Sequence, residues 1–390
     1  MHKFILISFF ILLSVNLCFT RSKENQSSSS SRKDSLITIT ITAVGDLMCH
    51  SGEYNYARVL PDSFNFNPFF RFVKPYLQSS DFTFGNLETV LAGKEKGYSG
   101  YPHFNSPSQF LAPLKNIGFD LITTANNHAL DQGKTGLLRT IEELKKYNLN
   151  YDGTFSSPKD RDSVRIYDIK GIKTAFLAYT YGTNGNPIPN GENYLINIID
   201  TTIIKSDIKV ARKEGAEIVL VYFHFGTQYD HYPDDYQKLI VKKTIKYGAD
   251  IIIGGHPHVI QPVNYFKTIN GKLDTGFVDY SVGNFISNQR WRYSDAGIIL
   301  SLHITKNFSS DSIYISRVTY LPTWVYKGPT SQGNEYLILP AQLSSADSSL
   351  SFLTESDKFK MEQAFGDTKN IMTQYTNKVF IQAPNNELYK

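Results

Sequence analysis

Apolar, strand-like segments and helix-like segments alternate through much of this chain, and five of the strand-like segments end in a polar motif. The motifs are Gly45-Asp46, Gly85-Asn86-Leu87-Glu88, Asn126-Asn127-His128, His224-Phe225-Gly226 and Gly255-His256-Pro257-His258. Alternation of strands and helices indicates an α/β fold built in layers. Because the carboxyl ends of strands in an open α/β sheet share one edge, we expect the five motifs to converge on one site.

Strands are predicted from runs of apolar and β-branched residues, and helices from apolar residues spaced three or four apart. The expected strands are 36–44, 81–85, 120–124, 217–223 and 251–253, and the expected helices are 68–78, 107–116, 137–147 and 235–247. Further along, the hairpin signal Asn270-Gly271 and strand-like runs at 273–280, 296–304 and 312–321 indicate added antiparallel strands. A last helix is expected near 355–365.

Composition limits the class of protein. A chain of 390 residues with 41% hydrophobic residues can bury a sizeable core, in one large domain or two small ones. The net charge is only +4, and Lys and Arg are scattered rather than clustered. The charge therefore gives no case for a nucleic-acid partner.

The first residues differ from the rest. Lys3 precedes an apolar run from Phe4 to Leu17, which is short for a bilayer span and predicts a signal segment over residues 1–20. An uncleaved anchor is the alternative. A Ser-rich linker is expected at 21–35, and Cys18 is a candidate for lipid attachment, although Leu17 is bulky where a small residue is usual. We therefore expect export to the cell envelope, the periplasm or the outside. Cys18 and Cys49 form no disulfide framework.

The residue types in the motifs suit a metal, because imidazole and carboxylate groups are ligands for Zn, Mn and Fe. Four of the nine histidines fall in the motifs: His128, His224, His256 and His258. Each motif alone has a structural explanation. Asp46 suits a turn, Asn127 or Asp131 a helix cap, Glu88 the first turn of a helix, and His224 a buried core position. An extended His-Pro-His segment is harder to explain by packing. The recurrence at strand ends therefore favours a polar functional site.

In these motifs the sequence resembles the CapA-type capsule or poly-γ-glutamate synthesis proteins, which are similar to calcineurin-like metallophosphoesterases. The resemblance runs from about Thr38 to Asn288. It is carried by AVGDLM (43–48), FGNLET (84–89), GFDLITTANNHALDQG (118–133), HFGTQY (224–229), GADIIIGGHPHVIQP (248–262) and YSVGNF (280–285).

The resemblance implies a layered α/β/β/α sandwich with mixed sheets, of metallophosphoesterase type, over residues 36–340, with 341–390 as a C-terminal extension. It implies one or two divalent metal ions. Asp46 would bind the first metal and Glu88 would lie near the bridging carboxylate. Asn127, His224 and His256 would bind the second metal, with His258 returning to the first. His128 would be the proton donor.

The sequence departs from the family pattern at several positions. Phosphoesterases usually have His where this chain has Met48, so the first metal is weakly held or His50 substitutes for the missing ligand. Glu88 stands where they have Asp. Phe225 and Gln228 stand where CapA-type proteins more often have Trp and Glu.

Two classes of function follow. The first is a metal-dependent hydrolase or transamidase acting on an anionic envelope polymer or peptide. The second is a non-catalytic protein that binds or exports such a polymer. Other capsule-synthesis membrane proteins are expected partners. His103, Tyr229 and Asn284 are candidates for substrate contact or for support of the metal ligands, although packing or turn roles explain each of them equally well.

Overall fold

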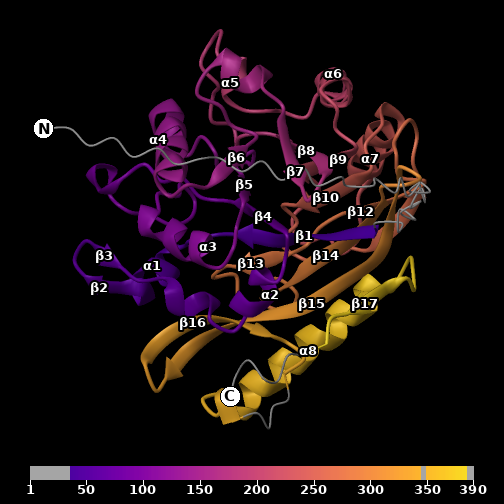
Figure 1. Cartoon of the computed structure of the whole chain (residues 1–390). Coiled ribbons are helices and arrows are strands. Elements are labelled where there is room, and N and C mark those ends of the chain that lie inside the picture. The colour runs from indigo at the N-terminus through magenta and orange to yellow at the C-terminus, as the bar shows by residue number, and fades with distance from the viewer. Residues whose placement is uncertain (1–35, 344–347, 384–390) are drawn as a thin grey trace, which may run out of the picture.

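The computed structural model describes residues 36–343 and 348–383, and in it two mixed β-sheets pack face to face (Figure 1). The first sheet runs in the spatial order β16 (Gly333–Pro340), β15 (Ser312–Thr330), β14 (Ala296–Asn307), β1 (Leu36–Leu47), β4 (Phe82–Leu87), β5 (Leu121–Thr123) and β6 (Asn150–Asp152). Two further strands join it: β13 (Asn284–Ile286) pairs with β1, and β17 (Val379–Ile381) pairs with β15.

The second sheet has six strands in the order β11 (Val263–Lys267), β12 (Thr275–Asp279), β10 (Ile251–Gly255), β9 (Ile218–His224), β8 (Ile172–Thr180) and β7 (Arg165–Ile169). A separate small pair is formed by β2 (Arg58–Leu60) and β3 (Ser63–Phe64). Strands β1, β4, β5 and β6 are parallel, as are β8, β9, β10 and β12. Strands β14 and β15 are antiparallel additions, as the sequence predicted, and β16, which was not predicted, continues the antiparallel part of the sheet.

The outer face of the first sheet is covered by α1 (Ser51–Ala57), α2 (Lys74–Gln78), α3 (Leu111–Asn116) and α4 (Gly133–Lys146). The outer face of the second sheet is covered by α6 (Thr201–Lys213) and α7 (Asp235–Tyr247). The remaining helices are α5 (Pro158–Asp162) and α8 (Glu355–Met372), and α8 shares a separate core cluster with Trp324 of β15. Ile141 of α4 shares a core cluster with Val44 of β1, and Ile208 of α6 shares one with Val221 of β9. The layers therefore run α/β/β/α, and the predicted fold class is confirmed.

The alternation of residues along β1 explains how the two cores divide. Ile39, Ile41 and Ala43 belong to the cluster between the sheets, whereas Val44 belongs to the cluster under the outer helices. Successive side chains of a strand point to opposite faces, so one strand supplies both cores. The side chain of Thr42 lies on the outer face, and its buried hydroxyl forms a hydrogen bond of 2.9 Å with the hydroxyl of Ser301 on β14.

Prolines account for one wrong prediction. The single helix expected at 68–78 is a 3₁₀ turn, η1 (Asn67–Phe70), followed by α2. Pro75 lies at the start of α2, and a proline without an N–H cannot continue a helix from before it. The helix expected at 137–147 begins earlier, at Gly133, and the helix expected at 355–365 extends to Met372.

The predicted hairpin is present as a longer loop. Strands β11 and β12 pair antiparallel, and Asn270 adopts a positive φ of 60° within the connection. Within the described residues, no helix combines the length and the apolar character needed to cross a bilayer. The predicted signal segment, the Ser-rich linker and Cys18 lie outside the described residues.

Candidate metal centre

The six predicted metal ligands meet at one edge of the sandwich, although more than two hundred residues separate the first from the last. All six are buried: Asp46, Glu88, Asn127, His224, His256 and His258. Five of them, all except Asn127, form two overlapping groups, and within each group the ligand atoms lie within 4.8 Å of one another. The first triad is Asp46, Glu88 and His258, and the second triad is Glu88, His224 and His256. Glu88 belongs to both.

Glu88 tests whether these residues fit a metal ion. Neither of its carboxylate oxygens has a hydrogen-bond partner among the described residues. Oε1 lies 3.4 Å from Nε2 of His224 and 3.7 Å from Nε2 of His258. Burial, together with the charge of Asp46, raises the pKa of Glu88 to about 8. A buried carboxylate without a partner is costly, and a cation bound between the two triads would compensate it. The residues therefore fit a divalent ion.

Asp46 is held by donors from both sheets. Its Oδ1 accepts a hydrogen bond from Nδ2 of Asn86 at 2.8 Å, and its Oδ2 accepts one from the backbone N–H of His256 at 3.2 Å. Burial by itself raises the pKa of Asp46, but His258, His224 and Asn86 outweigh it and hold that pKa well below its ordinary value. Asp46 is therefore ionised, as a metal ligand would have to be.

Asn127 offers the second triad a fourth ligand atom, its amide oxygen. Nε2 of His224 lies 2.7 Å from Oδ1 of Asn127 and 3.2 Å from Nδ1 of His256. Burial lowers the pKa of His224 to about 4, so its ring is neutral. Neutral imidazole nitrogen with an amide oxygen and a carboxylate oxygen suits Zn, Mn or Fe.

The loop that carries His256 and His258 is strained rather than extended. Both residues have positive φ, 96° and 60°, where the sequence predicted an extended segment. A non-glycine residue in this region costs free energy, and such strain persists where the surrounding structure fixes it. The strain turns both rings inward, and the expectation of an extended segment was wrong.

Asn284 lies behind His258. Its Oδ1 lies 3.1 Å from Nδ1 of His258, and its Nδ2 donates to the carbonyl oxygens of His258 and Ser294. The opposite ring nitrogen, Nε2, is then directed to Glu88. Asn284 therefore orients the ring of His258, a candidate metal ligand, and supporting a ligand is one of the roles weighed for it from the sequence.

His128 lies beside the metal ligands. Its Nε2 is 4.0 Å from Oε1 of Glu88, and its Nδ1 is 2.7 Å from Oδ2 of Asp131. The ring packs edge-on against Phe104 with the ring centres 4.7 Å apart. Asp131 does not cap a helix, because the N-cap of α4 is Gln132. The alternative explanation of this motif as a cap is therefore wrong.

A cavity of about 370 Å³ opens beside the first triad, and His258 of that triad lines it. It is lined by Met48, His50, Tyr101, His128, Gln228, Tyr229, His258, Asn288, Gln289 and Trp291. His50 neither replaces Met48 as a ligand nor points to solvent. Its Nδ1 accepts from the backbone N–H of Asn288 and lies 3.5 Å from Glu53. Tyr229 lies on the cavity wall, whereas His103 is exposed and does not line the cavity.

Residues 40–289 match the family described as bacterial capsule synthesis protein PGA_cap. The chain belongs to this family. The capsule biosynthesis protein CapA of Bacillus anthracis is 29% identical over 276 residues, which cover 69% of this chain and 64% of that protein. The PGA biosynthesis protein CapA of Bacillus subtilis strain 168 is 29% identical over 273 residues, covering 69% and 68%. The match thus spans about two-thirds of the length of these curated relatives.

Solved structures similar to this PGA_cap chain include a putative 5′-nucleotidase from Staphylococcus aureus in complex with α-ketoglutarate. That protein has a TM-score of 0.48 and 14% identity, with 85% of this chain and 58% of that chain covered. The calcineurin-like phosphoesterase YfkN from Bacillus subtilis has a TM-score of 0.42 and 12% identity, with 86% and 98% covered. At these scores, the evidence for the layered architecture is the arrangement of strands and helices in the PGA_cap chain itself.

Two asparagines of the PGA_cap motifs were not assigned a role from the sequence. Nδ2 of Asn86 donates to Asp46, and Nδ2 of Asn126 donates to Oδ1 of Asn86 at 3.1 Å and to the carbonyl of Leu87 at 2.8 Å. Oδ1 of Asn126 accepts from the backbone N–H of His128 at 3.1 Å. The two amides thus link three strand ends. Their position inside the motifs was the available signal.

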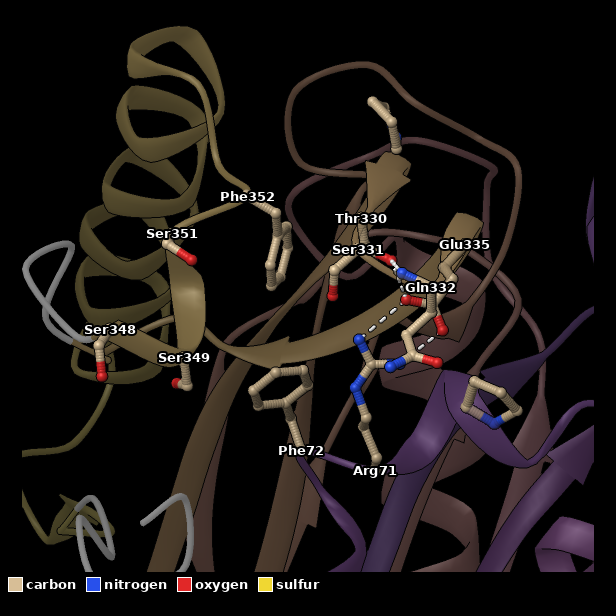
Figure 2. Close-up of a pocket in the computed structure, with 12 residues that line it drawn as sticks. Arg71, Phe72, Thr330, Ser331, Gln332, Glu335, Ser348, Ser349, Ser351 and Phe352 are labelled. Carbon is tan, nitrogen blue, oxygen red and sulfur yellow. Dashed lines mark hydrogen bonds and ion pairs between the residues drawn. The ribbon is translucent and has the colours of Figure 1, made fainter.

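A second cavity, of about 790 Å³, lies away from the candidate metal ligands, between residues 68–72, the β15–β16 hairpin and residues 348–352. Figure 2 shows the side chains of Arg71 and Glu335 side by side on its wall, with Phe72 and Phe352 also lining it. Arg71 donates two hydrogen bonds to Glu335, at 2.6 and 2.9 Å. The two charges satisfy each other, and none of the predicted site residues lines this cavity.

Proposed function

We propose that this chain is an exported protein of capsule or other anionic envelope-polymer synthesis with hydrolytic or transamidase activity that depends on one or two divalent metal ions. The observation that carries the proposal is Glu88: a buried carboxylate without a hydrogen-bond partner, shared by two ligand triads. Membership of the PGA_cap family supports a polymer as the substrate and capsule-synthesis membrane proteins as partners.

When bound, a divalent ion lowers the pKa of a water molecule and polarises the bond to be broken. The chain supplies the rest. Asn284 holds His258 in position, and Glu88 spans the two triads. His128, at the cavity wall beside Glu88, donates a proton to the leaving group through Nε2. Asp131 keeps a proton on Nδ1 and so fixes the orientation of the ring. If an amine instead of water accepted the group released from the substrate, the same residues would catalyse transamidation.

A second candidate function is polymer binding without turnover. Met48 favours it, because this buried thioether stands on the cavity wall where phosphoesterases usually place a histidine ligand. Thioether sulfur is a poor ligand for hard metal ions. Loss of one ligand would weaken the first metal, while Asp46, Glu88 and His258 remain for it.

Two histidine variants test the proposal. His258→Ala removes a ligand, so bound Mn or Zn and turnover should fall together. His128→Ala removes a proton donor only, so metal content should stay while turnover falls roughly 10²–10⁴-fold. Metal content is measured by mass spectrometry of the purified protein, and turnover with γ-glutamyl oligomers and with a generic phosphate ester. His303→Ala, which removes a histidine of β14 that bonds Thr40 and Thr319, is the matched control and should change neither.

One combination of results would contradict the enzyme proposal. Metal-loaded protein that cleaves neither substrate, together with a His128→Ala variant that still complements a polymer-deficient strain, would favour the binding function.

A further inference from the structure

The wall of the cavity beside the metal centre carries no positive side chain of the kind that recognises a polyanion. None of its ten lining residues is Lys or Arg. Sites that hold anionic chains focus positive charge along the path of the ligand. A bound metal would neutralise one anionic group at the centre, but the wall around it offers no partner for a row of carboxylates.

Aromatic rings take the place of charge. Tyr101, Tyr229 and Trp291 line the cavity, with exposed fractions of 75%, 39% and 51%. The rings of Tyr229 and Trp291 meet at 69° with their centres 5.3 Å apart. Exposed large rings grouped at one cavity mark a binding surface, since scattered single rings need no explanation but a cluster does.

Hydrogen bonds fix the backbone at two of these aromatic residues. The carbonyl oxygen of Trp291 accepts hydrogen bonds from the backbone N–H groups of Ser294 and Asp295, both at 3.1 Å, and from the hydroxyl of Ser294 at 3.0 Å. Tyr229 has a φ of 67° and donates its backbone N–H to the carbonyl oxygen of Pro257 at 2.8 Å. A backbone that is fixed before binding loses little conformational entropy when a ligand packs against the rings it carries.

Three amide side chains line the cavity together with the rings. They belong to Gln228, Asn288 and Gln289. Nε2 of Gln289 donates to the hydroxyl of Tyr229 at 3.4 Å, and its Oε1 accepts from Asn284 at 3.1 Å. A planar amide offers a donor and an acceptor side by side, which suits neighbouring hydroxyl groups. An aromatic face suits the C–H face of a sugar ring.

We infer that the group bound in this cavity is a sugar carrying a phosphate ester, and not a chain of γ-linked glutamates. The inference rests on the proposed function and names its substrate class. In the reaction the oxygen of water bonds to phosphorus and the phosphorus–oxygen bond to the sugar breaks. The sugar oxygen takes a proton from Nε2 of His128, and a proton of the water replaces it. The products are a free sugar hydroxyl and inorganic phosphate.

Trp291→Ala tests the inference in the full chain loaded with Mn. Phosphate release is measured from glucose 1-phosphate and from glycerol 3-phosphate, which lacks a ring. Loss of one ring contact should lower kcat/KM for the sugar phosphate about tenfold, through KM. The value for glycerol 3-phosphate should not change. Phe359→Ala, an exposed ring on α8, is the matched control and should leave both unchanged.

A binding arm separates this inference from the proposed function. Binding of an N-acetylglucosamine tetramer and of a γ-glutamyl tetrapeptide is measured by calorimetry with wild type and with Trp291→Ala. Sugar binding that is lost in the variant, without turnover of any ester, supports the sugar site and refutes the enzyme. Turnover of glycerol 3-phosphate with no dependence on Trp291 for glucose 1-phosphate overturns the sugar site and leaves the enzyme. Tighter binding of the tetrapeptide than of the sugar, independent of Trp291, also overturns it.

Discussion

Nδ1 of His128 lies 2.7 Å from Oδ2 of Asp131, three residues further along the chain. The carboxylate also accepts the backbone N–H of Phe104 at 2.8 Å, so it is fixed from two sides. A proton held on Nδ1 fixes the tautomer of the imidazole. The pair resembles the arrangement by which a buried carboxylate orients a catalytic histidine, and here it directs Nε2 toward Glu88 and the cavity.

Asp131→Asn should therefore separate orientation from metal binding. The amide no longer favours the proton on Nδ1, so we expect turnover to fall roughly 10–100-fold with bound metal unchanged. Metal analysis and the phosphate-release assay measure the two quantities. Asp235→Asn, at a fully exposed site on α7, serves as control. Equal loss of metal and rate in Asp131→Asn would show that Asp131 supports the fold of the site and not the proton donor.

Asp152 should make stability depend on pH. This residue at the end of β6 is buried, its Oδ2 has no hydrogen-bond partner among the described residues, and burial raises its pKa to about 7. A carboxyl whose folded pKa is raised stabilises the fold below its unfolded pKa, and that contribution is lost as pH rises from about 4 to about 7. The advantage of Asp152→Asn over wild type should grow across this window, by up to about 4 kcal/mol. Urea unfolding at several pH values measures it, and the exposed Asp162→Asn should show no such trend.

The contribution of Glu335 to the free energy of unfolding should show the opposite dependence on pH. Burial raises its pKa, but the hydrogen bonds from Arg71 and Thr330 outweigh burial and leave the pKa lowered. Its contribution is therefore present above the unfolded pKa and is lost as pH falls through the folded value. At neutral pH, Glu335→Gln should lower the free energy of unfolding by roughly 1–2 kcal/mol, and the difference should close toward pH 3.

The exposed pair of Lys94 and Asp62 provides the comparison for Glu335. Both side chains are more than half exposed, so Asp62→Asn should change the free energy of unfolding by less than about 1 kcal/mol at any pH. An equal effect of the two substitutions would contradict a stabilising role for the partly buried pair.

Export is the last prediction. The short apolar run after Lys3 predicts that the mature protein lacks residues 1 to about 20, or carries a lipid on Cys18. Mass spectrometry of the protein from its native host measures the N-terminus and any lipid. A mature protein that starts at Met1 in the cytoplasm would rule out export, and Cys18→Ser should release a lipid-anchored form without changing turnover.

Most of the strands around the site could be predicted because they are buried runs that end at glycine or a polar residue. The run Ile251–Ile253 followed by Gly254 is an example, and its strand β10 extends through Gly255. Strand β7 was not predicted, since its partly exposed residues give a weak sequence pattern, and the buried strand β8 was missed with it. The helix at 68–78 was wrong because apolar spacing was given more weight than Pro75.

The convergence of the candidate metal ligands could be predicted, because parallel strands end at a shared edge of the sheet. The residues that form the wall of the cavity could not be predicted in this way. Trp291 and Gln289 lie in a loop whose conformation depends on contacts with residues far along the chain, such as Tyr229. No periodicity or spacing predicts such a contact. His103 illustrates the converse, because proximity in sequence to Phe104, which packs on His128, did not bring its side chain into the cavity.

Gly255 of the second sheet approaches Asp46 of the first so closely that an added Cβ would lie 3.0 Å from Oδ1 of the carboxylate. Facing sheets usually lie about 10 Å apart, so here the sandwich is pinched shut at one edge. Asp46 and Glu88 come from one sheet, and His224 and His256 from the other. Each triad combines residues from both sheets, so an ion bound by either triad would join the two sheets. A chelator would then open the sandwich at this edge before it disturbed either sheet alone.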